Sequence, residues 1–285
     1  MPINRLIQNS ILCIIAIAIS SCSTAYYLDK HPVLSKNIIY QRVIRAENKL
    51  NQDKKKPDLL LSACQVRTQY TYAFIVEKAD RLIESDYQAG KQLYQDALNS
   101  FEIAIHYGKT ALEIRYPDLF NHTDININYS HFIIEDVPYL YWLAAALGGA
   151  ISSSRGKSEW VIQLPIVGYL LESALAIDSS WNYGAVHSAM ITYAMARTDL
   201  KGKNIEEATK HYAKVNVLSN SQDLSAHVSY AENVLVNQQN QSEFIHLLNS
   251  VINAQDTVIE ELELGNIIAR KRARWLLTRK DELFY

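Results

Sequence analysis

Apolar residues recur at three- and four-residue steps along most of the chain, which is the spacing of one face of an α-helix. The first long stretch of this kind covers residues 57–83. A second begins after Ser85 or Asp86, either of which can cap a helix, and continues to Pro117, which ends it. The pattern therefore predicts two helices joined by a short connection, packed as an antiparallel hairpin.

The most apolar stretch after the N-terminal region is residues 137–151, preceded by Asp136 as a predicted helix cap. With 15 residues it is shorter than the ~20 that a membrane-spanning helix needs. Aromatic side chains occupy its first half and small residues its second, so neighbouring helices can approach it closely. We expect a central helix whose aromatic residues either fill the core or line a cavity.

The second half of the chain contains a loose internal repeat. Predicted helices end at Asp178, Asn220 and Asp256, at spacings of 42 and 36 residues. Asn204 and Glu207 have the spacing of a capping box at the start of one of these helices. Periods near 34 residues or somewhat longer are typical of tetratricopeptide-like repeats, whose stacked helix pairs leave a concave surface. We therefore predict an all-α fold, an antiparallel helical array with tetratricopeptide-like helix-turn-helix repeats, α-solenoid-like in form.

The N-terminal region has the features of an export signal. Arg5 precedes an apolar run at 11–19, and Ile19-Ser20-Ser21-Cys22 resembles a bacterial lipobox. We expect residues 1–21 to be removed, 22–56 to form a tether lipidated at Cys22 with a helix at 37–50 that docks on the body, and 57–285 to form one all-helical domain. The alternative is an ordinary cleaved signal that contains a cysteine by chance. The lysine run at 54–56 is interpreted as a solvated face, whose attraction to anionic headgroups is weaker than an acyl anchor.

Composition and charge exclude several classes of protein. The 28 basic and 30 acidic residues leave no positive excess for binding nucleic acid. Nine glycines and six prolines are too few for a sandwich or barrel with many tight turns. With Cys13 in the signal and Cys22 lipidated, Cys64 has no disulfide partner, and we interpret it as a small buried core residue.

The sequence contains no recognised catalytic motif, and we expect no enzymatic activity and no cofactor. His122, Asp124 and His131 could hold a metal ion, but they lack the spacing of a zinc-binding helix, so a polar loop is the favoured interpretation and no metal is expected. His187 lies in an apolar helical segment and is interpreted as a hydrogen-bonded core residue.

Several blocks in this order resemble one known family. They are Gln69-Tyr70-Thr71-Tyr72-Ala73-Phe74 after Leu59-Leu60-Leu61, Tyr141-Trp142-x-Ala144-Ala145, Glu172-x-Ala174-Leu175-x-Ile177-Asp178, Gly184-Ala185-x-His187, Ala208-x-x-x-Tyr212 and Arg272-Ala273-Arg274-Trp275-Leu276-Leu277. This arrangement, from about Pro57 to Phe284, resembles the TatT component of TRAP (tripartite ATP-independent periplasmic) transporters. Departures occur in two loops, at Lys201-Gly202-Lys203-Asn204 and Asn220-Ser221-Gln222.

The resemblance implies an all-helical lipoprotein that forms a homotrimer. It also implies pairing with a TRAP-type periplasmic solute-binding protein and an apolar channel for a hydrophobic or organic-acid ligand. On this hypothesis the protein is anchored in the cell envelope facing the periplasm, and Ser23 after Cys22 favours the outer membrane. The candidates for the cavity wall are Tyr139, Trp142, Trp181 and Tyr183.

A second hypothesis is a tetratricopeptide-like scaffold lipoprotein that holds envelope-assembly proteins in its concave face without a small ligand. A closed apolar cavity would favour the first hypothesis, and an open polar groove the second.

Overall fold

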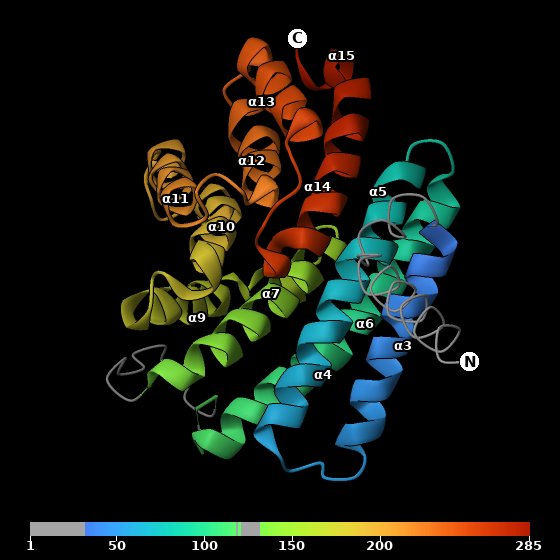
Figure 1. Cartoon of the computed structure of the whole chain (residues 1–285), viewed down its shortest axis with the longest axis vertical. Coiled ribbons are helices and arrows are strands. Elements are labelled where there is room, and N and C mark those ends of the chain that lie inside the picture. The colour runs from blue at the N-terminus through green and yellow to red at the C-terminus, as the bar shows by residue number, and fades with distance from the viewer. Residues whose placement is uncertain (1–31, 118, 121–131) are drawn as a thin grey trace, which may run out of the picture.

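The computed structural model describes residues 32–117, 119–120 and 132–285, and in these ranges every regular element is a helix (Figure 1). The all-α prediction is therefore confirmed. The predicted signal segment, Cys22 and the candidate metal residues His122, Asp124 and His131 lie outside the described residues.

The N-terminal part is a layer of long helices. Its elements are α3 (Pro32–Leu50), α4 (Pro57–Tyr70), the π-helix η1 (Thr71–Val76), α5 (Glu77–Leu82) and α6 (Tyr87–Arg115). The predicted hairpin is present, with α4 to α5 running antiparallel to α6 (Figure 1). Asp86 caps α6, where its carboxylate accepts the N–H of Ala89 at 3.0 Å. The first helix of the hairpin differs from the prediction, because a π-helical turn interrupts it.

Helix α7 (Val137–Ser153) is the central helix, packed against α6 on one side and α9 (Leu164–Ile177) on the other. Leu140, Leu143 and Leu147 are fully buried on it. These contacts confirm that the apolar segment is a core helix.

Asp136 occupies the predicted cap position at the start of α7, but its side chain does not cap that helix. The second residue of α7, Pro138, has no N–H to donate. The buried carboxylate of Asp136 instead accepts the N–H of Ile133 at 2.8 Å and a bond from Arg115 Nε at 2.5 Å. Asp136 therefore ties the 3₁₀ turn η3 (Ile134–Asp136) to the end of α6.

The C-terminal half is a series of helices that packs beside and above this layer (Figure 1). After α9 its elements are α10 (Trp181–Ala196), α11 (Asn204–Leu218), α12 (Leu224–Tyr230), the π-helix η4 (Ala231–Leu235), α13 (Gln241–Asn253), α14 (Glu260–Thr278) and α15 (Lys280–Leu283). Helices α9, α11 and α13 end within three residues of the predicted repeat ends. The solenoid-like detail stays a prediction.

Asn204 does not form the predicted capping box. The residue before α11 is Lys203, and the Asn204 amide donates to the carbonyl oxygens of Ala194 at 2.7 Å and Arg197 at 2.6 Å. The last carbonyls of a helix lack partners within that helix, so this amide satisfies the end of α10. It therefore joins consecutive helices rather than starting one.

The main hydrophobic core lies between α4, α6, α7 and α9, and a second core lies between α12, α13 and α14. Cys64 is fully buried in the first, and burial raises the pKa of its thiol to about 12, which confirms its interpretation as a core residue. By length and composition alone, one described segment, Ser158–Ile177, is apolar enough to cross a membrane. It consists of the short helix α8 (Ser158–Val161) and α9, and α9 packs into the main core.

Candidate functional site

Three aromatic side chains meet where α7 approaches the start of α10. The ring of Tyr141 lies 5.1 Å from that of Trp142 and 5.0 Å from that of Trp181, measured between centroids. Two of the four candidate wall residues, Trp142 and Trp181, are thus brought together through Tyr141. Tyr141 is not among the predicted wall residues, although it directly precedes Trp142.

The other two candidates lie in different surroundings. Tyr139 is buried, its hydroxyl donates to Asp58 at 2.6 Å, and the guanidinium of Arg115 lies 4.9 Å from its ring centre. Tyr183 is 38% exposed and adopts a left-handed backbone conformation with φ of 58°, in a turn at the start of α10. The structure therefore does not show these two residues in contact with the three rings.

Tyr72 extends the aromatic group from η1. Its hydroxyl donates to the carbonyl oxygen of Ala145 on α7 at 3.1 Å, and its ring packs edge-on against Phe101. We refer to Tyr72, Tyr141, Trp142 and Trp181 as the aromatic cluster. These four side chains come from three separate elements, which the linear sequence does not show to be adjacent.

Two tyrosines of the aromatic cluster, Tyr72 and Tyr141, have raised pKa values. The side chain of Tyr72 is 38% exposed, yet burial raises its pKa above the ordinary value for tyrosine. The pKa of the half-buried Tyr141 is also raised, first by burial and then by the charge of Asp223. Both rings are therefore in part surrounded by protein, as the contact of Tyr72 with Phe101 and of Tyr141 with two tryptophans also shows.

The π-helical geometry of η1 is seen in its hydrogen bonds. The hydroxyl of Thr71 donates to the carbonyl oxygen of Arg67 at 2.8 Å, in addition to the regular bond from the Thr71 N–H. The N–H of Glu77 bonds five residues back, to the carbonyl of Tyr72. Turns of this type are frequent at functional sites, and this one positions both Tyr72 and Glu77.

Glu77 belongs to an ion-pair centre around Arg272 of α14. The Arg272 guanidinium donates to Glu77 at 2.6 Å, to Asp80 at 2.8 Å, and through two nitrogens to Glu232 at 2.7 and 2.5 Å. Burial alone lowers the pKa of Arg272, but the three carboxylates more than offset this and raise it above its ordinary value. The ring centre of Trp275 lies 5.3 Å from the guanidinium. We refer to these charged residues as the Arg272 centre.

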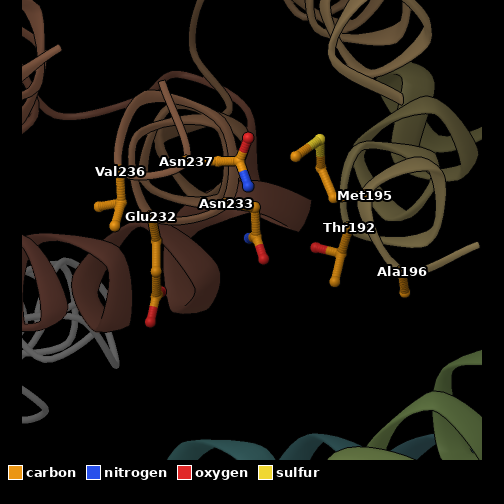
Figure 2. A pocket seen from close by; sticks show the side chains of 7 residues that line it. All are labelled: Thr192, Met195, Ala196, Glu232, Asn233, Val236 and Asn237. Atoms are coloured by element: carbon orange, nitrogen blue, oxygen red, sulfur yellow. The ribbon is translucent and has the colours of Figure 1, made fainter. Parts of the chain in front are cut away.

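Glu232 also lines a pocket of about 350 Å³ between α10 and η4, shown in Figure 2. Figure 2 shows Asn233 and Asn237 on the η4 side and Thr192 and Met195 on the α10 side. The amide nitrogen of Asn233 donates to the carbonyl of Ser229 at 2.9 Å. The full lining is Thr192, Met195, Ala196, Glu232, Asn233, Val236 and Asn237. This pocket is open and partly polar, in contrast to the aromatic cluster.

A second pocket of about 370 Å³ lies between α9 and the end of α10. Its lining includes Tyr169, Tyr193 and Arg197, whose guanidinium pairs with Glu172 at 2.9 Å and Asp199 at 2.6 Å. The four candidate wall residues line neither of these two pockets, so their role as a ligand-binding wall stays a prediction.

Metal-ligating side chains do not gather in the described ranges, where no group of three or more His, Cys, Asp or Glu residues is placed to hold an ion. Two histidines do meet within the described residues: His187 on α10 and His211 on α11, whose Nδ1 atoms lie 2.8 Å apart. This contact confirms His187 as a hydrogen-bonded core residue.

Comparison with known proteins gives one family and one relative. A family model described as "TRAP transporter T-component" matches residues 42–284. The chain is also 22% identical over 232 residues to an uncharacterized protein of Treponema pallidum (strain Nichols), a match that covers 79% of this chain and 72% of that protein. The helical fold and the match over most of its length show that the chain belongs to the TRAP transporter T-component family.

Proposed function

We propose that the protein is a lipid-anchored accessory component of a TRAP-type transport system that docks a periplasmic solute-binding protein and holds an apolar ligand against the aromatic cluster. Family membership supports a role in TRAP transport and a location in the cell envelope. The lipobox-like sequence at Cys22 supports the anchor, and Ser23 supports the outer membrane. A homotrimer is part of this proposal.

The observation that carries the ligand proposal is the meeting of aromatic rings from separate elements. Tyr141 contacts Trp142 and Trp181 with ring centres 5.1 and 5.0 Å apart, and the partly exposed Tyr72 bonds to the same helix α7. Ligand sites are mostly concave and apolar with a few polar groups that orient the ligand. The four aromatic rings and the hydroxyls of the two tyrosines supply that combination here.

Binding of the neutral fluorescent probe N-phenyl-1-naphthylamine tests the ligand site. We expect Trp142→Ala combined with Trp181→Ala to weaken its binding about tenfold or more, because two apolar walls are lost. Trp160→Ala is the matched control, since Trp160 is half-buried on α8, away from the cluster. Unchanged binding in the double variant would show that these tryptophans do not form the wall.

The docking proposal is tested by affinity purification of the protein from its own envelope, with mass spectrometry of the proteins that copurify. Recovery of a TRAP-type solute-binding protein supports the transport role. The mass of the detergent-solubilised complex tests the trimer, and membrane fractionation tests the outer-membrane location.

The scaffold hypothesis is favoured by one observation, the open and partly polar pocket between α10 and η4. Such a surface suits a peptide segment rather than a small apolar molecule. Recovery of envelope-assembly proteins without a solute-binding protein, together with no binding of the apolar probe by the native protein, would support the scaffold and contradict the transport role.

A further inference from the structure

Helix α3 carries a row of exposed cations along one side. Arg42, Arg45 and Lys49 follow one another at three- and four-residue spacing, which places them on the same helical face over about 10 Å. Three exposed lysines, Lys54, Lys55 and Lys56, continue the row in the connection to α4. We refer to these six residues as the basic stripe.

The charge of the basic stripe is not neutralised within the described part of the chain. None of its side chains forms an ion pair there, and the one carboxylate of α3, Glu47, bonds instead to Arg67 and to Tyr107 at 3.3 Å. Residues 32–56 contain seven cations and two carboxylates, whereas the whole chain has a net charge of −2. The positive charge is therefore segregated at the N-terminal edge of the fold.

An apolar side chain lies beside the cations. Ile38 precedes Arg42 by one helical turn and is 39% exposed. Another side of α3 is buried, since Ile39, Val43 and Leu50 pack into the body. A helix that is fixed to the protein on one side and presents cations with an apolar neighbour on another suits the headgroup region of a membrane.

We propose that the basic stripe lies against anionic lipid headgroups of the membrane that holds the protein. This inference rests on the proposed acyl anchor at Cys22. Nine residues lie between Cys22 and Pro32, and the ten residue steps span at most ~36 Å, so an anchored chain keeps α3 beside the membrane surface. Tethering raises the local concentration of headgroups, which favours lipid over soluble polyanions as the partner.

The experiment uses the acylated full protein bound to vesicles. Lysine accessibility is measured with a water-soluble acetylating reagent and mass spectrometry, in vesicles of phosphatidylcholine alone and in vesicles with about one-third phosphatidylglycerol. We expect severalfold slower labelling of Lys49 and Lys54–56 in the anionic vesicles, relieved in 0.5 M salt because salt screens the attraction. Labelling of the exposed Lys91 and Lys214 is the internal control and should be the same in both.

A pair of variants makes the test specific to the stripe. Arg42→Gln with Arg45→Gln should restore labelling of Lys54–56 in anionic vesicles, whereas Lys91→Gln with Lys214→Gln, an equal loss of charge elsewhere, should not. Equal labelling in neutral and anionic vesicles would overturn the proposal. So would protection by added polyglutamate but not by lipid, which would assign the stripe to an acidic protein. Failure of the protein to float with either kind of vesicle would instead contradict the anchor at Cys22.

Discussion

At the scale of single residues, two adjacent glycines of α7 have different roles. A Cβ atom added at Gly149 would collide with the ring of Phe101, which is fully buried. A Cβ atom at Gly148 would meet only the hydroxyl of Tyr72, at 3.9 Å, an ordinary van der Waals distance. The first glycine allows α6 and α7 to pack closely, and the second borders the aromatic cluster.

Alanine substitutions at these two positions should differ in their effect on stability. Gly149→Ala is expected to lower the free energy of unfolding by about 1–3 kcal/mol, because Phe101 has no free space to move into. Gly148→Ala should leave it unchanged or raise it by up to ~1 kcal/mol, since alanine is the better helix former. Urea denaturation of both variants measures this, and equal effects would contradict the packing described here.

Single residues also show where sequence reasoning fails. Asp136 and Asn204 both occupy positions that local pattern identifies as helix caps, yet each side chain bonds to a distant partner or a neighbouring helix. Asp86 caps its helix as expected because it is exposed and has no such competitor. Capping rules therefore hold where the local backbone is the best available partner, and fail where tertiary structure supplies a better one.

At the scale of elements, the contact between α10 and α11 contains a histidine pair. The Nδ1 atoms of His187 and His211 are 2.8 Å apart, so one proton at most lies between them. Burial lowers the pKa of both, that of His211 to about 4. Lys214 near His187 and Lys210 near His211 lower the pKa further, while Glu207 opposes them.

The histidine pair predicts sensitivity to acid. In the unfolded chain the imidazole of His211 binds a proton near pH 6.5, but in the folded protein only near pH 4, so its contribution to stability is complete above pH 6.5 and is lost as the pH falls through 4. His211→Gln should therefore lose less stability between pH 7 and pH 4.5 than the native protein does. Thermal denaturation at the two pH values measures this. His246→Gln, at an exposed position, is the control and should lose as much stability between the two pH values as the native protein does. If His246→Gln instead loses as little as His211→Gln, the assignment to the histidine pair is contradicted.

The sequence predicts the positions of the helices better than it predicts the contacts between them. The spacing of apolar residues predicts the hairpin and the core position of α7. Proline and aspartate residues predict helix ends, because these signals are local. The two π-helices could not be predicted, since the apolar spacing of their residues is that of an α-helix. Only the hydrogen bond to the carbonyl five residues back, instead of four, distinguishes them. Trp142 and Trp181 were recognised as candidate partners by residue type, but Tyr72 was not, because only the three-dimensional structure places η1 over α7.

At the scale of the whole molecule, the Arg272 centre joins the N-terminal layer to the C-terminal helices. Arg272 lies on α14, whereas Glu77 and Asp80 lie about 190 residues earlier on α5. Arg279 of the same C-terminal region pairs with Glu84 in addition. These bonds connect the N-terminal layer directly to the C-terminal helices, a connection that no local pattern predicts.

Removing the central cation should destabilise the whole fold. Arg272→Met leaves three partly buried carboxylates without their shared partner, and we expect a loss of about 2–4 kcal/mol. Arg274→Met, an exposed position on the same helix, should change stability by less than ~0.5 kcal/mol. Thermal denaturation measures both. Similar melting temperatures for the two variants would show that the centre does not hold the two parts together.

The π-helix η1 also affects which positions of the chain can lose a residue without disturbing the fold. Residues Thr71–Val76 contain the extra residue of a wide turn, and an α-helix advances about 100° per residue. Loss of one residue there would close an ordinary turn and leave Glu77 and Asp80 facing Arg272, whereas loss of one residue from the regular helix α4 would rotate both by about 100°. The same loss in the connection at 197–203 would only shorten a surface loop. A change of one residue in length is therefore tolerated in some parts of this chain. In other parts it would turn the N-terminal layer out of register with the C-terminal helices.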